Sequence, residues 1–231
     1  MLARLFLLAV VIGLLAGAFL ILSPRSPGWE VTADAPLVIG GYGDNFSYSG
    51  KGVRPLSGSL SFTYGPEART GVISVTLATT AESGTLQLGA GEALSGEIIL
   101  SGRIAPTDRI VADTDIHGDT GLWGPELPRV HAILAGTGTF DLLVDGKPVY
   151  TDMVGEWSLE QALHQPDGSI RKSGLYYSPL LRDKTGFADP DRLEFDLIVH
   201  SPAADQGNNP PYTIVLHLVF THVAIEHRPA D

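Results

Sequence analysis

Polar and apolar residues alternate along much of this 231-residue chain, and this alternation limits its fold more than any other feature. In segment 56–64, Leu60, Phe62 and Tyr64 fall on one side, and serine and threonine fall on the other. A period of two places one set of side chains in a core and the other in water, which is the pattern of a β-strand. The same pattern predicts strands at 72–80, 85–88, 97–104, 130–134, 140–144, 193–200 and 213–225.

Turn signals separate these strands and indicate the fold class. The chain has 27 glycines, where an average protein of this length has roughly 16. Asp145-Gly146 lies between two apolar runs and predicts a hairpin, because a type I′ turn needs positive φ at both central residues. Ser158-Leu-Glu-Gln161 matches a capping box and Pro166 follows it, so one short helix is expected. These features predict an all-β fold, a β-sandwich of short antiparallel strands, with a β-barrel as the alternative.

The N-terminal segment determines the expected location. Residues 5–22 carry no charge and would form a helix about 27 Å long, close to the roughly 30 Å of a bilayer core. This predicts a transmembrane anchor; the alternative is a signal peptide cleaved after Ala16-Gly-Ala18. Both alternatives carry the rest of the chain across a membrane. We therefore expect an extracytoplasmic protein, at the cell surface or in the periplasm, which is secreted if the segment is cleaved.

The expected domain organisation follows from this segment. Residues 1–22 form the anchor or signal peptide, residues 23–28 a Pro-rich linker, and residues 29–231 one extracytoplasmic domain; a split near 105–125 is the alternative. Ala9, Gly13 and Gly17 recur every four residues in the anchor, a spacing that lets two helices approach closely and form a dimer. The chain has no cysteine, so it has neither a lipid attached through cysteine nor a disulfide.

Charge and motifs exclude several functions. Lys and Arg number 15 and Asp and Glu 26, which gives a formal charge of −11 and argues against nucleic acid as a partner. The nucleophile elbow, the zinc-protease helix and the phosphate-binding loop have no match in the sequence. Glu194 and Asp196 share one strand face, as a glycosidase pair would, but a solvated strand face is the favoured explanation, because many acidic strand pairs have this spacing.

Two sets of residues are candidate metal ligands. The segment Asp113-Thr-Asp-Ile-His-Gly-Asp119 places oxygens at alternate positions and, with Glu126, could hold calcium, although the sequence favours a solvated acidic turn between strands. If the strands at 193–200 and 213–225 pair with Asp196 opposite His217, His200 lies on the same face. Those three residues would suit zinc or copper. Ordinary strand histidines are the alternative, because no His-x-His pair is present.

Aromatic residues in a Gly-rich loop, and a second aromatic pair shortly after another glycine, are candidates for a binding surface, since aromatic side chains on loops bind sugars or peptides by stacking. They are Tyr42, Phe46, Tyr48, Tyr176 and Tyr177, and core packing is the alternative. Taken together, the sequence favours a membrane-tethered β-domain with a non-catalytic binding or assembly role. Its partner would be a protein near the membrane or an envelope polymer. A calcium-binding module and an envelope-glycan hydrolase are the alternatives.

Overall fold

The computed structural model describes residues 28–39, 53–79, 86–87, 93–124, 127–165, 188–203 and 212–228, which form twelve strands and no helix. The strands are β1 (Gly28–Val38), β2 (Arg54–Pro55), β3 (Ser57–Gly65), β4 (Thr70–Ala78), β5 (Leu86–Gln87), β6 (Ala93–Leu94), β7 (Glu97–Ile104), β8 (Ile110–Ile116), β9 (Val130–Val144), β10 (Lys147–Ala162), β11 (Asp189–His200) and β12 (Val215–Arg228). The all-β prediction is confirmed.

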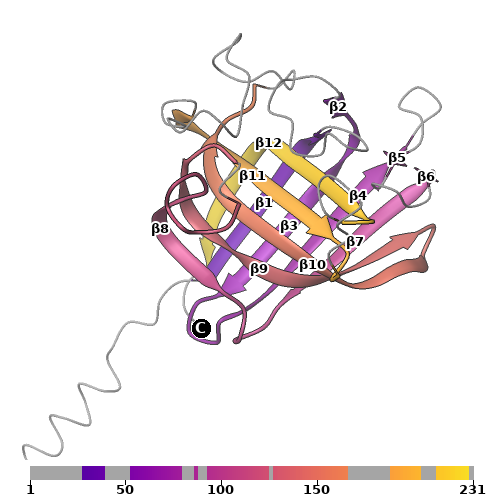
Figure 1. Ribbon diagram of the computed structural model, residues 1–231, viewed down its shortest axis with the longest axis horizontal. Coiled ribbons are helices and arrows are strands. Elements are labelled where there is room, and N and C mark those ends of the chain that lie inside the picture. Colours follow the sequence, from indigo (N-terminus) through magenta and orange to yellow (C-terminus); the bar gives the residue numbers. More distant parts are fainter. Residues whose placement is uncertain are drawn as a thin grey trace, which may run out of the picture.

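Eight of these strands close into an antiparallel barrel (Figure 1). The order around the barrel is β1, β3, β4, β7, β9, β10, β11 and β12, and β12 pairs with β1. Near and far strands cross at a steep angle, because closing a sheet requires its strands to tilt (Figure 1). Outside this circuit, β2 pairs with β1, β8 pairs with the first half of β9, and β5 pairs with β6.

Aromatic side chains fill the interior of the barrel. The buried Phe62 ring lies 4.9 Å from Trp157 and 5.7 Å from Phe195, measured between ring centroids. All eight barrel strands contribute side chains to this one core. Burying a large apolar side chain contributes about 1.5–3 kcal/mol, so these rings supply much of the fold's stability.

The predicted sandwich is wrong, and the barrel alternative describes the fold. A sandwich keeps two sheets with separate edges, whereas here the last strand pairs with the first over most of its length, from Gly28 with Arg228 to Val38 with Leu218. On the other side of the molecule, β10 pairs with both β9 and β11. The circuit of hydrogen bonds through these eight strands therefore has no edge.

The predicted short helix is also wrong, because residues 158–161 belong to β10. Trp157 and Leu159 point into the barrel core, while Ser158 and Glu160 are buried on the opposite face. Pairing with a strand on each side outweighs the local capping-box signal. The Ser158 hydroxyl donates to the Glu160 carboxylate two residues ahead, which is the neighbour on the same face of a strand.

Several strand predictions are confirmed in detail. The segment predicted at 97–104 is β7, and the Asp145-Gly146 turn joins β9 to β10 with φ values of 47° and 74°. The separate strands predicted at 130–134 and 140–144 are one strand, β9. Position 136 in this strand is glycine because a Cβ there would lie 2.7 Å from the Trp157 ring.

The predicted anchor at residues 5–22 lies outside the described residues, as do Ala9, Gly13 and Gly17. Among the residues that the structure describes, no helix has the length and apolar character needed to span a membrane. Strands on both sides of residues 105–125, the alternative domain boundary, belong to one sheet.

Candidate functional site

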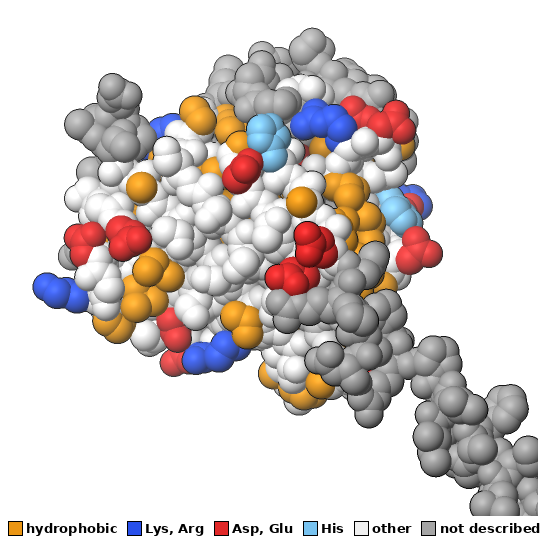
Figure 2. Space-filling view, turned by 180° about the vertical axis from the view of Figure 1, so that it is seen from behind, with side chains coloured by type: hydrophobic (Ala, Val, Ile, Leu, Met, Phe, Trp, Pro, Cys, Tyr) orange, Lys and Arg blue, Asp and Glu red, His pale blue; other side chains and the backbone are white. Residues whose placement is uncertain are grey.

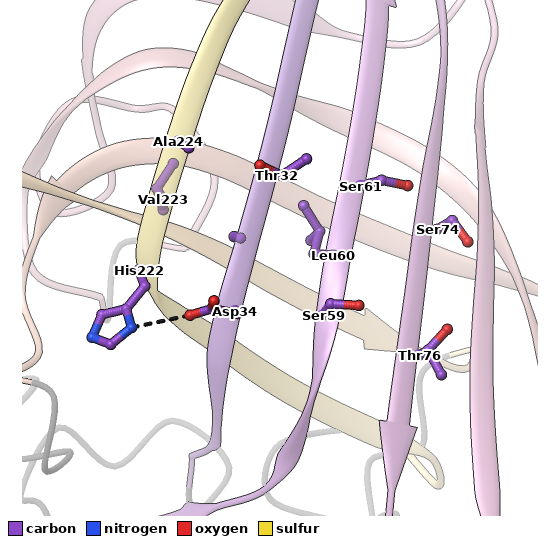
Figure 3. Close-up of a pocket in the computed structure, with 11 residues that line it drawn as sticks. Thr32, Asp34, Ser59, Leu60, Ser61, Ser74, Thr76, His222, Val223 and Ala224 are labelled. Carbon is purple, nitrogen blue, oxygen red and sulfur yellow. Dashed lines mark hydrogen bonds and ion pairs between the residues drawn. The ribbon is translucent and has the colours of Figure 1, made fainter.

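A shallow groove lies on the outer wall of the barrel, over β12, β1, β3 and β4 (Figure 3). It has a volume of about 530 Å³. We call it the hydroxyl groove. Its lining residues are Thr32, Ala33, Asp34, Ser59, Leu60, Ser61, Ser74, Thr76, His222, Val223 and Ala224.

The chemistry of the hydroxyl groove follows from strand alternation. Leu60 faces the core, so its neighbours Ser59 and Ser61 face outward, and Ser74 and Thr76 do the same on β4 (Figure 3). At one end, Nδ1 of His222 lies 3.0 Å from a carboxylate oxygen of Asp34. Small hydroxyl side chains and one exposed ion pair offer donors and acceptors on an almost flat surface. The side of the molecule in Figure 2 is likewise mostly neutral side chains and backbone, with charged groups scattered over it.

A second set of polar side chains, all buried except the partly exposed Glu156, lies against the outer faces of β10, β11 and β12. We call it the polar layer. It comprises Glu156, Ser158, Glu160, Glu194, Asp196 and His217 on the strands, and His117 and His164 from the segments that follow β8 and β10. Glu160, Glu194 and His217 have no exposed surface, so these groups form part of a second core outside the barrel.

Each imidazole of the polar layer contacts a carboxylate. Nε2 of His217 lies 3.0 and 3.1 Å from the two oxygens of Asp196. Nδ1 of His164 lies 3.1 Å from Glu194, whose other oxygen accepts the His164 backbone N–H at 3.0 Å. Nε2 of His117 lies 2.8 Å from Glu156. Buried polar groups need such partners, because an unpaired charge in a core is costly.

The pKa values of two carboxyl groups in the polar layer are shifted in opposite directions. Burial raises the pKa of Glu160 well above its usual value, and the nearby Asp196 and Glu194 raise it further against a smaller opposing effect of the Ser158 hydrogen bond. Burial also raises the pKa of Asp196, but His217, with His164 and His117, outweighs that effect and holds this pKa below its usual value. Paired carboxyls with diverging pKa values are common in functional sites and in structural networks alike.

The predicted set Asp196, His217 and His200 is brought together only in part. β11 and β12 pair as expected, but the register sets Ile198 opposite His217, two residues from the predicted register. Asp196 still reaches His217 diagonally. His200 instead stacks on Tyr212, with ring centroids 3.8 Å apart, and its Nδ1 contacts the Ser201 carbonyl oxygen. The metal assignment stays a prediction.

The predicted calcium ligands Asp113, Asp115 and Asp119 lie on β8 and the turn after it, facing Arg129 and His131. Arg129 contacts Asp115 at 2.6 Å and Asp119 at 3.5 Å, and His131 lies 3.0 Å from Asp115 and 3.1 Å from Asp113. The hydrogen bonds from Arg129, then from His131, lower the pKa of Asp115. A bound cation would have to displace these partners. Glu126 lies outside the described residues.

Two further outcomes concern the candidate ligands. Within the described ranges, no group of three or more His, Asp or Glu side chains is arranged to hold a metal ion. The five aromatic residues predicted as a binding surface, Tyr42, Phe46, Tyr48, Tyr176 and Tyr177, all lie outside the described residues. Their role stays a prediction.

Sequence reasoning missed the hydroxyl groove and most of the polar layer. The sequence contained a signal for the groove, because the outward faces of two predicted strands carry hydroxyl residues: Ser59, Ser61, Ser74 and Thr76. Glu160 also had one, because Ser158 and Glu160 alternate with Trp157 and Leu159 in strand fashion. His117 and His164 had none, since their partners are 39 and 30 residues away.

Comparisons with protein-family models, with curated proteins and with solved structures give no significant match. The class of the protein is therefore defined by its own features. It is a closed antiparallel β-barrel with an aromatic core and two polar sites outside the barrel, one open and one buried.

Proposed function

We propose that this chain is a non-catalytic binding domain, held outside a membrane by residues 5–22, and that the hydroxyl groove binds its partner. The observation that carries the proposal is the groove itself, an open surface of donors and acceptors across four adjacent strands. Since aromatic side chains fill the barrel core, the outer wall is where we place binding. The carboxyls Glu160, Glu194 and Asp196 are no more than 3% exposed, so a hydrolase substrate would not reach them in this arrangement.

The chemistry of the groove favours a hydroxyl-rich polymer of the cell envelope. Hydroxyl side chains both donate and accept hydrogen bonds, as the hydroxyls of a polysaccharide do. Each such bond contributes only about 0.5–1.5 kcal/mol, so several must form together along an extended chain. A groove that crosses four strands provides that length of contact.

Replacing Ser61 with arginine should weaken binding to the insoluble envelope polysaccharide of the organism that produces this chain by about tenfold or more. The bulky cation would project into the groove and remove one hydroxyl, while leaving the core unchanged because Ser61 is exposed. Loss of one to two hydrogen bonds accounts for such a change. The measurement is co-sedimentation of the full chain, purified in detergent, with that polysaccharide.

Thr151→Arg is the matched control, because Thr151 is exposed on β10 and does not line the groove. Both variants should melt at the wild-type temperature. Equal binding by wild type, Ser61→Arg and Thr151→Arg would contradict the assignment of the groove.

The tether is tested separately by fractionation. We expect the full chain to stay with membranes after washing with concentrated salt, to be extracted by detergent, and to be digested by protease added outside the membrane. Deleting residues 5–22 should leave the chain in the cytosolic fraction, where it is synthesised, because that segment supplies the only predicted translocation signal. A full chain recovered in the cytosolic fraction would contradict the tether.

A further inference from the structure

Among the described residues, two segments of chain pack over the polar layer on the outside of the barrel and contact its carboxyl groups. We call them the cover segments: residues 117–124, which follow β8, and residues 163–165, which follow β10. His117 and Leu163 in these segments are 2% and 1% exposed. Leu163 packs with Leu127, Ile198 and Val215 in a small apolar cluster separate from the barrel core. In the other cover segment, Leu122 and Trp123 pack against a second apolar cluster that includes Ile116 and Val130. The cover is therefore held by these apolar contacts and by the contacts of His117 and His164 with the carboxyl groups beneath it.

A charge count of the polar layer leaves one carboxyl over. Three imidazoles, those of His117, His164 and His217, face four carboxyls, those of Glu156, Glu160, Glu194 and Asp196. Even with every imidazole protonated, the described residues of this layer leave one carboxyl without a cationic counterpart. The contacts identify it as Glu160, because each of the other three carboxyls contacts an imidazole directly.

The surroundings of Glu160 agree with its being the carboxyl of this layer that contacts no imidazole. Its Oε2 accepts a hydrogen bond from the neutral Ser158 hydroxyl. Its Oε1 is fully buried and has no hydrogen-bond partner among the described residues. On the neighbouring strand β11, the register places Glu194 directly opposite Glu160. A carboxylate in this position would face like charge from Glu194 and Asp196 without compensation.

We propose that Glu160 is a proton-controlled latch: its neutral form lets the cover segments close over the polar layer, and its ionisation releases them from the barrel wall. The groups that face it are Glu156 and Ser158 from β10, Glu194 and Asp196 from β11, and more distantly His217 from β12 with His117 and His164 from the cover segments. This inference does not depend on the proposed function. Release would expose a surface rich in carboxylates and imidazoles.

The direction of the pH response follows from the raised pKa of Glu160, which burial causes first and the neighbouring carboxylates second. When the cover is closed, Glu160 keeps its proton to a higher pH than it does in water. Stabilisation of the closed state is complete below about pH 4.3, the ordinary value for glutamate, and is lost as pH rises through the pKa of the closed state. Over that range each opening event releases one proton, so the opening equilibrium rises up to tenfold per pH unit.

The test is hydrogen exchange of the full chain followed by mass spectrometry at several pH values, with rates corrected for intrinsic exchange. In the wild type, protection of residues 117–124 and 163–165 should fall by tenfold or more with rising pH, while protection of β4 stays constant. In Glu160→Gln, which keeps the shape but cannot ionise, protection of the cover segments should not depend on pH. The matched control is Glu226→Gln, an exposed glutamate on β12 that should behave as the wild type does.

Either of two results would overturn the latch: constant protection of the cover segments in the wild type, or the same pH-dependent loss in Glu160→Gln. If Glu160→Gln does not fold, Glu160→Met takes its place, because an apolar side chain of similar length removes the charge without adding a donor. The same two results then apply to it.

Discussion

Alanine at Gly155 should destabilise the barrel strongly in the wild type and far less when Phe140 is replaced by leucine. A Cβ on Gly155 would lie 2.1 Å from the Phe140 ring, and a Cβ on Gly102 would lie 2.4 Å from the same ring. The ring is fully buried and thus fits between two glycines on the strands at either side of β9. Overpacking of this kind costs about 1–3 kcal/mol.

The measurement is a double-mutant cycle by urea denaturation with Gly155→Ala, Phe140→Leu and the combined variant. The combined variant should be more stable than the sum of the single changes predicts, by most of the overpacking cost. Gly65→Ala is the matched control, because its nearest heavy atom would be 3.8 Å away, an ordinary contact distance. Additive effects of the two substitutions would show that the ring does not set the cost.

The sequence predicted most strands but not the way in which they close. Period-two patterns marked β3, β4, β7, β11 and β12, because one face of these strands is apolar over several residues. β1 was missed, since Ala33, Ala35 and Pro36 weaken its alternation. This strand pairs with β12 on one side and β3 on the other. If β1 is not recognised, no strand links β3 to β12, and the predicted strands are then assigned to the two separate sheets of a sandwich.

The polar layer shows why the candidate site was harder to predict. Polar residues at alternate positions on a strand indicate a solvated face only if nothing covers that face. Glu194 and Asp196 fit the solvated pattern, yet all residues of β11 from Glu194 to Val199 are buried, so both faces of this part of the strand are covered. The cover comes from distant parts of the chain, through contacts such as His117 with Glu156. Strand periodicity carries no information on such contacts.

The last prediction compares two histidine–aspartate pairs that differ chiefly in burial. His217 and Asp196 are at most 4% exposed, whereas His222 and Asp34 are 60% and 68% exposed, and both pairs have contacts of 3.0 Å. Removing one partner of a buried pair leaves the other charge without compensation and costs about 3–5 kcal/mol, whereas an exposed pair contributes about 0–1 kcal/mol. We therefore expect a large loss of stability in His217→Leu and almost none in His222→Leu.

The pH dependence gives the sharper test of the buried pair. In the wild type the pKa of Asp196 is lowered, because His217 outweighs the effect of burial. Its stabilisation is present above about pH 3.9 and is lost as pH falls through the lowered pKa. In His217→Leu burial dominates, the pKa of Asp196 rises, and the variant is destabilised by ionisation as pH increases. The difference in unfolding free energy between wild type and His217→Leu should therefore grow from pH 3 to pH 7 in urea denaturation. A difference that stays constant over this range would show that His217 contributes through packing rather than through the charge of Asp196.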